Sequence, residues 1–252
     1  MNRRQLLSFI AEGSAAGEPV VMVTYLGADL KAEKVAVSRS GSVFGSIDDP
    51  KVFREAVAYA ERLFSSRKNA EVVEIVDEGG RASKVILEVV RRKPSLIVFG
   101  AGHVGQAVAL MGAMVGYRVT VVDDREEFLS RKRLPDPRIQ LETRRFEDAV
   151  RPDELSSSSA VVIVTRGHQF DEICLKGVIG SRAGYIGMIG SRRRVLSVFR
   201  KLKEEGAVEA DLDRVHAPIG LEIGARSPQE IAVAIIAEII QVMNVGGYTS
   251  KG

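Results

Sequence analysis

The sequence predicts an α/β protein with a small N-terminal α+β domain, residues 1–92, and a doubly wound parallel-sheet domain, residues 93–252. The length of 252 residues exceeds the usual domain size of about 100 to 150 residues. A basic run, Arg91-Arg92-Lys93, and then Pro94 mark a boundary between the two parts. Beyond it, short apolar segments alternate with helical patterns, which is typical of a parallel sheet covered on both faces.

Composition excludes several classes of protein. Apolar residues make up 45% and charged residues 27%, the mix of an ordinary globular chain. The net charge of +3 does not indicate a nucleic-acid partner. The apolar stretch Leu6–Ala11 is too short for a signal peptide, and no segment approaches the roughly 20 apolar residues that cross a bilayer. Cys174 is the only cysteine, so we expect a reducing, cytoplasmic location.

The first domain is expected to combine two helices with several strands. A short helix opens the chain, and Asp49 and Pro50 fit the N-cap and first position of a second helix that ends near Phe64. The expected strands are 19–27, 34–38, 71–76 and 84–90.

The second domain shows a regular alternation of strands and helices. The expected strands are 96–99, 118–122, 160–165, 185–189 and 215–219. The expected helices are 104–114, near 170–179, 192–205 and 227–243.

A complete GxGxxG motif follows the first of these strands and opens a helix. Its residues are Gly100, Ala101, Gly102, His103, Val104 and Gly105. Asp123 ends the next strand about 20 residues on, which is the placement that a Rossmann-like dinucleotide site requires. A carboxylate there accepts from ribose hydroxyls and repels a 2′-phosphate, which favours NAD over NADP, although Arg125 close by weakens this inference. The alternative is a glycine turn that serves packing alone.

A second anion site is suggested by the segment from Gly187 to Arg194. Gly190 precedes Ser191, which fits the N-cap of a predicted helix, and three arginines follow in the first turn of that helix. Positive side chains there are unfavourable to the helix dipole. A bound anion at Ser191 and Arg192 would offset that cost. A solvated basic face is the alternative.

Further candidates follow the later strands. Thr165, His168 and Asp171 lie at the predicted end of a strand, where open α/β sheets collect ligands. His103, His168 and His216 all fall at strand ends, so we expect them to converge on one crevice. Glu222 lies between two glycines in a loop that either approaches a ligand or is a packing turn. No metal-ligand spacing is present.

The ordered motifs GAGHVG, VVDDRE, TRGHQFD, GMIGSRRR and HAPIGLEIGARSPQEIA resemble the XdhC/CoxI family over essentially the whole second domain. The resemblance implies an accessory factor for molybdenum hydroxylases such as xanthine dehydrogenase. Such a factor binds the molybdenum cofactor, a molybdopterin, protects it during sulfuration and delivers it to the apoenzyme. The implied partners are the hydroxylase apoenzyme and a cofactor sulfurase, and a homodimer is the default expectation for oligomeric state.

The first domain departs from the family pattern. Members often carry a cysteine where this chain has Ile47, and a second one where it reads Glu78-Gly79-Gly80. A thiolate is a good soft ligand for molybdenum. Without these thiols, we expect the chain to recognise the cofactor through phosphate, pterin and nucleotide contacts.

The leading hypothesis is a binding and delivery protein without catalytic residues or turnover of its own. Backbone and hydroxyl donors would come from the glycines of the motif and Ser191, charge from Arg192, and the remaining ligand contacts from Asp123, His103, His168 and Asp171. An NAD-dependent oxidoreductase using NAD(P) and a nucleotide-sensing regulatory module are the alternatives.

Overall fold

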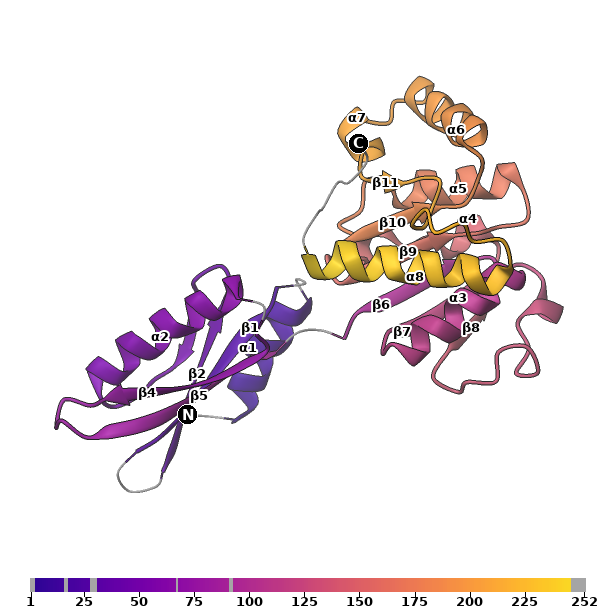
Figure 1. The fold of residues 1–252 in the computed structure, drawn as a ribbon. Coiled ribbons are helices and arrows are strands. Elements are labelled where there is room, and N and C mark those ends of the chain that lie inside the picture. The colour runs from indigo at the N-terminus through magenta and orange to yellow at the C-terminus, as the bar shows by residue number, and fades with distance from the viewer. Residues whose placement is uncertain (1–2, 16–17, 28–30, 67, 91–92, 246–252) are drawn as a thin grey trace. The chain divides into compact units, whose positions relative to one another are not determined.

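A computed structural model describes residues 3–15, 18–27, 31–66, 68–90 and 93–245. The chain divides into two compact units, residues 1–92 and residues 93–252 (Figure 1). Arg91 and Arg92 of the predicted boundary run lie outside the described residues. Within the described ranges, no helix has the length and apolar character that crossing a bilayer needs.

The first unit is built on a five-stranded antiparallel sheet with the strand order β3-β2-β1-β5-β4. Its strands are β1 (Val20–Leu26), β2 (Ala32–Ser38), β3 (Val43–Gly45), β4 (Ala70–Val76) and β5 (Ala82–Val90). Its helices are α1 (Arg3–Ala15) and α2 (Pro50–Ser65). The three-residue strand β3 is not among the strands expected from the sequence.

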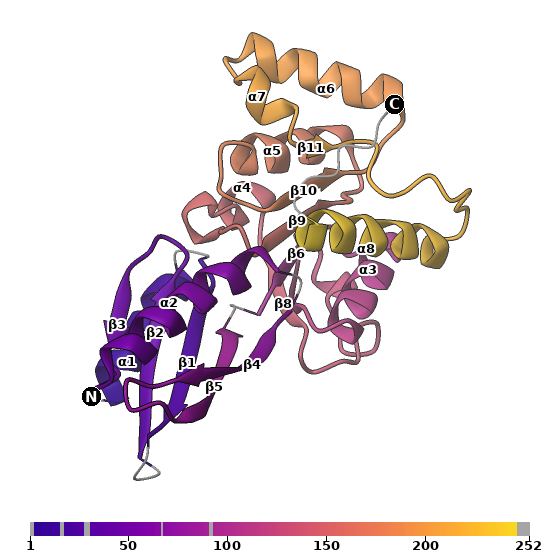
Figure 2. The same ribbon diagram turned by 60° about the vertical axis from the view of Figure 1, so that its left-hand side comes forward.

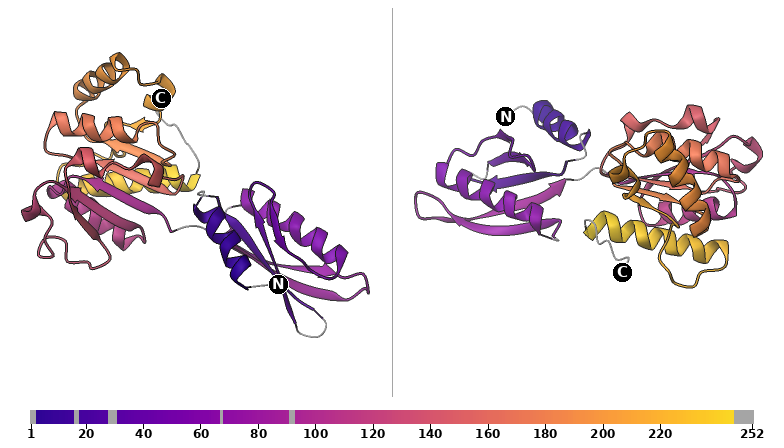
Figure 3. Two further views of the ribbon diagram at one scale, coloured as in Figure 1. Left: turned by 180° about the vertical axis from the view of Figure 1, so that it is seen from behind. Right: turned by 90° about the horizontal axis from the view of Figure 1, so that it is seen from above.

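The two helices cover opposite faces of this sheet (Figure 3). Successive side chains of a strand point to opposite faces, so Val21 and Val23 of β1 pack with α2 while Val20 packs with α1. The predicted start of α2 is confirmed, because the Asp49 carboxylate accepts from the amides of Lys51 and Val52, both at 2.9 Å. An N-cap of this kind stabilises a helix by about 1 kcal/mol.

The second unit holds a six-stranded sheet in which every pair is parallel, with the order β11-β10-β9-β6-β7-β8. Its strands are β6 (Ser95–Phe99), β7 (Arg118–Asp123), β8 (Gln140–Thr143), β9 (Ser159–Ile163), β10 (Tyr185–Met188) and β11 (Val215–His216). Its helices are α3 (His103–Met114), α4 (Phe146–Ala149), α5 (His168–Val178), α6 (Arg192–Glu204), α7 (Glu209–Leu212) and α8 (Pro228–Val245), and two short 3₁₀ turns are η1 (Glu126–Phe128) and η2 (Pro152–Glu154).

Helices cover both faces of the parallel sheet (Figure 2). Leu96 and Val98 of β6 share a core with α3 and α8, whereas Ile97 and Phe99 of the same strand pack on the side of α5 and α6. A strand buried on both faces must be apolar at every position, which is why Leu96–Phe99 reads as a continuous apolar run. The predicted doubly wound sheet is confirmed.

The structure differs from the sequence-based expectation at three places. The sequence does not indicate the strand β8, because its side chains are exposed or half-buried and its composition is polar. The strand expected over 215–219 pairs only at Val215 and His216, since Pro218 has no amide to continue the ladder. The short helices α4 and α7 were also missed, each being a single turn of four residues.

Candidate ligand site at the switch point of the parallel sheet

The connections of the sheet change direction between β6 and β9. The chain adds β7 and β8 on one side of β6, and then β9, β10 and β11 on the other. Open α/β sheets bind ligands outside the carboxyl ends of the strands at such a switch point. Two segments meet there: the glycine turn, Gly100–Gly105 after β6, and the threonine loop, Thr165–Asp171 after β9.

Two glycines of the glycine turn are explained by packing. Gly100 has φ +108°, and a Cβ there would lie 2.4 Å from the Val164 carbonyl oxygen in the segment after β9. A Cβ at Gly105 would lie 1.9 Å from the Gly100 carbonyl oxygen. Both positions therefore exclude any larger residue without reference to a ligand.

Gly102 is different, because neither packing nor conformation requires a glycine there. Its φ of −67° is open to any residue, and an added Cβ would meet no heavy atom of the described residues within 4 Å. Its missing side chain leaves open space directly before α3. This is the position at which a dinucleotide fingerprint lets the backbone approach a phosphate.

The start of α3 is built to receive an anion. Gly102 is the N-cap residue, and in the part of the chain that the structure describes no side chain caps the helix or places a carboxylate in its first turn. The amides of the first turn and the positive end of the helix dipole thus face the open space at Gly102. Ala101 is buried, Val104 is half-buried and His103 is exposed at the first helical position.

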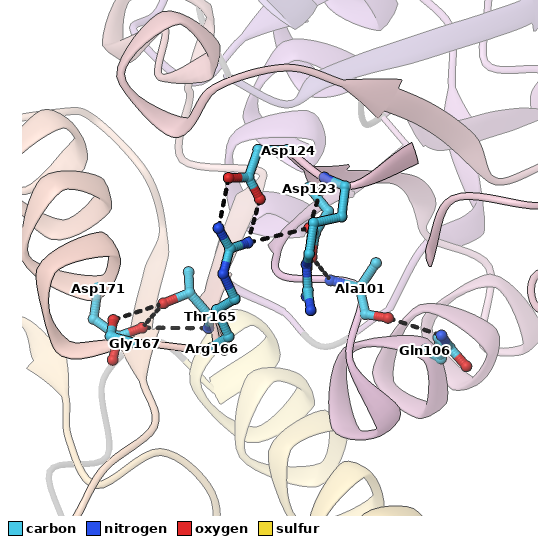
Figure 4. A network of polar contacts seen from close by, with 9 residues as sticks. Ala101, Gln106, Asp123, Asp124, Thr165, Arg166, Gly167 and Asp171 are labelled. Carbon is cyan, nitrogen blue, oxygen red and sulfur yellow. Dashed lines mark hydrogen bonds and ion pairs between the residues drawn. The ribbon is translucent and has the colours of Figure 1, made fainter. Parts of the chain in front are cut away.

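Asp123 ends β7 beside this turn, but it is not the free acceptor that the sequence suggested. Its carboxylate accepts from the Ala101 amide at 2.7 Å and from the Arg125 amide at 3.1 Å (Figure 4). The Arg125 guanidinium holds both oxygens, with Nε at 2.9 Å from Oδ1 and Nη2 at 3.0 Å from Oδ2. The Asp123 side chain is only 1% exposed, so its role in this structure is to fasten the glycine turn to β7.

An ion pair connects Asp124, directly after β7, with Arg166 of the threonine loop. Arg166 donates to both oxygens of Asp124 and lies 3.8 Å from Asp123 (Figure 4). Its guanidinium covers the Phe170 ring. The side-chain hydrogen bond from Arg166 lowers the pKa of Asp124. Because β6 lies between β7 and β9 in the sheet, this ion pair spans the carboxyl end of β6.

Asp171 is also an internal partner. It is fully buried and accepts from the Thr165 hydroxyl, from the Thr165 amide at 3.2 Å, and from the Arg194 guanidinium of α6. Burial lowers the pKa of Arg194, whose Nε is buried without a hydrogen-bond partner among the described residues. Thr165 and Asp171 therefore hold the threonine loop to α6, and a direct ligand contact by Asp171 would require this pair to open.

The arginine turn, Gly190–Arg194, has partners of its own. The Ser191 hydroxyl accepts from the Arg194 amide at 3.3 Å, so the predicted N-cap is confirmed. Arg192 donates to Glu222 at 3.1 Å, and both side chains are largely exposed, at 82% and 89%. A countercharge for Arg192 thus comes from the 217–225 loop.

The three histidines do not form one cluster. His103 starts α3 and His168 starts α5, with the side chain of His168 lying outside the described part of the chain. His216 stacks on Tyr185 with 4.7 Å between ring centroids, and its Nδ1 is 3.6 Å from buried Glu238. Three strand spacings, roughly 14 Å, separate β11 from β6, so the expected convergence is wrong for His216.

One feature that the sequence did not reveal is a groove of about 1030 Å³ beside the 217–225 loop, which we call the loop groove. It is lined by this loop, by the first turns of α6 and by α8, with apolar Leu196, Ile223 and Ile231 on its walls. Tyr185 donates to Glu238 at 2.6 Å on the same side. Burial raises the pKa of Glu238, but hydrogen bonds from His216, Tyr185 and the Gly220 amide lower it on balance.

Comparison with known proteins identifies the domain that carries these features. Residues 96–239 match the family described as the XdhC Rossmann domain. The chain belongs to the XdhC family.

Two curated relatives share the sequence. The uncharacterized protein YqeB of Escherichia coli strain K12 is 33% identical over 218 residues, which cover 84% of this chain and 40% of the relative. A Bacillus subtilis strain 168 protein, described as a probable xanthine dehydrogenase subunit, is 29% identical over 161 residues, 64% of this chain and 46% of the relative. The chain thus spans less than half the length of these relatives.

A solved structure shares the fold. A protein of Bacillus halodurans described as a xanthine dehydrogenase superposes with a TM-score of 0.64 at 24% identity, covering 98% of this chain and 66% of that one. The similarity extends over both units of the present XdhC protein.

The two positions where the family resemblance led us to expect cysteine lie in neighbouring loops of the first unit. Ile47 is 5% exposed and packs in the core with α2. The Glu78 amide donates to Asp49 at 2.9 Å, so the N-cap of α2 ties both loops together. The side chain at position 47 is therefore part of the hydrophobic core of the first unit.

Cys174 does not replace these thiols. It is fully buried in α5, and burial followed by the charge of Glu147 raises its pKa well above the ordinary range. A buried neutral thiol is a poor ligand for a metal. The open start of α3 at Gly102 can thus accept a phosphate-bearing group, whereas the buried Cys174 offers no thiolate to a metal.

Proposed function

We propose that the chain is an accessory factor that binds the molybdenum cofactor and delivers it to a xanthine-dehydrogenase-type molybdenum hydroxylase. The observation that carries this proposal is the open, uncapped start of α3 at Gly102 inside an XdhC Rossmann domain. The curated relative described as a probable xanthine dehydrogenase subunit supports the choice of client. The protein would act in the cytoplasm beside that client.

Each part of the glycine turn would have a separate task. The amides of Gly102, His103, Val104 and Gly105 would hold the phosphate, because the start of α3 offers them no internal acceptor side chain. Asp123 would keep the turn in place through the Ala101 amide. The cofactor, when bound, supplies the redox chemistry of the client enzyme, and the role of this chain is to bind it, shield it and release it.

The test is a reconstitution assay in which cofactor-loaded protein activates the apo form of a molybdenum hydroxylase. The parent is compared with Gly102→Val, which fills the open space, and with Cys174→Ala, which removes the only thiol. We expect stoichiometric activation by the parent and by Cys174→Ala, and none by Gly102→Val even though it folds.

A different result would favour another function. Multiple turnovers of NADH by the parent, without activation of any apoenzyme, would contradict delivery and favour an NAD-dependent oxidoreductase. The melting temperature in the presence of NAD, NADP or molybdopterin shows which ligand class binds, because a ligand that binds only the folded state raises it. A nucleotide that binds without turnover or delivery would favour the sensing module.

Two further proposals concern assembly. A homodimer follows from the general frequency of two-fold assemblies. A cofactor sulfurase as second partner follows from the family resemblance. Light scattering of the purified chain and co-purification with a sulfurase are the respective measurements.

A further inference from the structure

We propose that the end of the ligand site beside β7 recognises a phosphate group through Arg125. A nucleotide with a 2′-phosphate on its ribose should then bind more tightly than one with a free ribose. This inference rests on the glycine turn being the phosphate site of the proposed function, and it concerns the adjoining part of the same ligand.

Asp123 has no capacity left for a ribose. Its Oδ2 accepts from the Ala101 amide and from Arg125 Nη2, and its Oδ1 accepts from the amide and Nε of Arg125. At 1% exposure, the side chain offers almost no surface to a ligand. The group that would repel a 2′-phosphate is therefore both covered and neutralised.

Arg125, by contrast, keeps an unused edge. A guanidinium has five N–H donors, and the Asp123 carboxylate engages only those on Nε and one on Nη2. The two protons of Nη1 and the second proton of Nη2 have no hydrogen-bond partner among the described residues. Nη1 and Nη2 form a planar fork that matches two oxygens of a phosphate.

This edge of Arg125 is already fixed in position. The guanidinium lies 3.8 Å from the centroid of the Phe128 ring, and the side chain is 25% exposed. Stacking and the ion pair together restrict the side chain before any ligand arrives. Binding therefore avoids most of the entropy cost of ordering a long side chain.

The surroundings contain further charges. Arg133 covers the same Phe128 ring at 4.7 Å and adds a second cation. Glu126 and Glu127 follow Arg125 on exposed positions, where solvent and salt screen them. The closest carboxylate, Asp123, is the one that Arg125 already neutralises.

The experiment uses two probes that share a 5′-phosphate for the glycine turn. Adenosine 2′,5′-bisphosphate carries the additional 2′-phosphate, and 5′-AMP lacks it. Isothermal titration of the full chain with each probe gives the ratio of their Kd values. We expect the bisphosphate to bind at least about tenfold more tightly, as a bidentate phosphate–arginine contact should.

Two variants and one control test the residue. Arg125→Lys keeps a cation beside Asp123 but loses the fork, and Arg125→Gln keeps a donor and loses the charge. Arg138→Ala is the matched control, because Arg138 grips Asp136 through the same Nε and Nη2 contacts at an exposed site. The preference should fall to about one for Arg125→Gln, fall in part for Arg125→Lys, and stay unchanged for Arg138→Ala.

The outcomes separate this inference from the proposed function. Equal affinity for the two probes, or a preference that survives both Arg125 variants, overturns the role of Arg125 and leaves the glycine turn as a phosphate site. Failure of both probes to bind overturns the phosphate site itself, and with it this inference. Circular dichroism of each variant identifies any that fails to fold, and the comparison then rests on the variant that does fold.

Discussion

The glycine turn and the arginine turn have the same plan, a parallel strand followed by a glycine and a helix, yet they differ in what satisfies the helix start. At the arginine turn, Ser191 caps α6, Glu222 pairs with Arg192, and Asp171 pairs with Arg194. At the glycine turn, no described side chain caps α3, and Gly102 borders space that no described residue fills.

This difference shows which of the two turns is prepared for a ligand. Amides and charges that already have internal partners gain little from an added anion, because those contacts must first be broken. An uncapped helix start retains its donors for an external partner. The pattern of strand, glycine and helix is thus insufficient to identify a phosphate site without the partners of its side chains.

The largest expected effect on stability comes from breaking the ion pair between Asp171 and Arg194 of the arginine turn. Asp171→Ala leaves Arg194 without its countercharge and removes the acceptor of the Thr165 amide, so unfolding should become easier by about 3 kcal/mol. Urea denaturation measures the change. Glu205→Gln, which breaks an exposed pair with Lys176, serves as control and should cost less than about 1 kcal/mol. Equal effects would contradict a structural role for Asp171.

The second largest effect is expected at Gly105, a position of the glycine turn where packing excludes a larger residue. Gly105→Ala places a Cβ 1.9 Å from the Gly100 carbonyl oxygen, so the turn and α3 must move apart. Overpacking of this kind costs about 1–3 kcal/mol. Thermal unfolding measures this loss of stability. The matched control is Gly180→Ala, where the added Cβ meets no atom of the described residues within 4 Å. Gly116→Ala is not a suitable control, because Gly116 has a φ of +95°.

The third effect separates binding from stability. Gly102→Val meets no protein atom at its Cβ position and should change the free energy of unfolding by no more than about 1 kcal/mol. The same side chain fills the space for the phosphate, so affinity for 5′-AMP should fall at least about tenfold, or 1.4 kcal/mol. Full affinity in a folded Gly102→Val protein would remove the glycine turn as the site.

The smallest effect is expected at Arg192. Its pair with Glu222 is almost fully solvated, and such pairs contribute about 0–1 kcal/mol. Arg192→Ala should therefore leave both stability and affinity for 5′-AMP nearly unchanged. A clear loss of affinity, together with a shallower dependence on salt, would show that the arginine turn does hold an anion and would restore the sequence-based expectation.

The sequence by itself determined the local features. The apolar strands, the N-caps at Asp49 and Ser191, and the order of strand, glycine turn and helix are patterns within a few residues, and each was found where predicted. The polar strand β8 and the two-residue pairing of β11 were not, because neither has a distinctive local pattern.

Only the tertiary structure decided which charged groups are free. Asp171 pairs with Arg194 across 23 residues, Arg192 with Glu222 across 30, and Arg166 with Asp124 across 42. Such partners are brought together by the sheet order, and no local pattern encodes them. For that reason the sequence presented Asp123 as a ribose acceptor, while the fold buries it beneath Arg125, whose guanidinium keeps donors without a partner among the described residues.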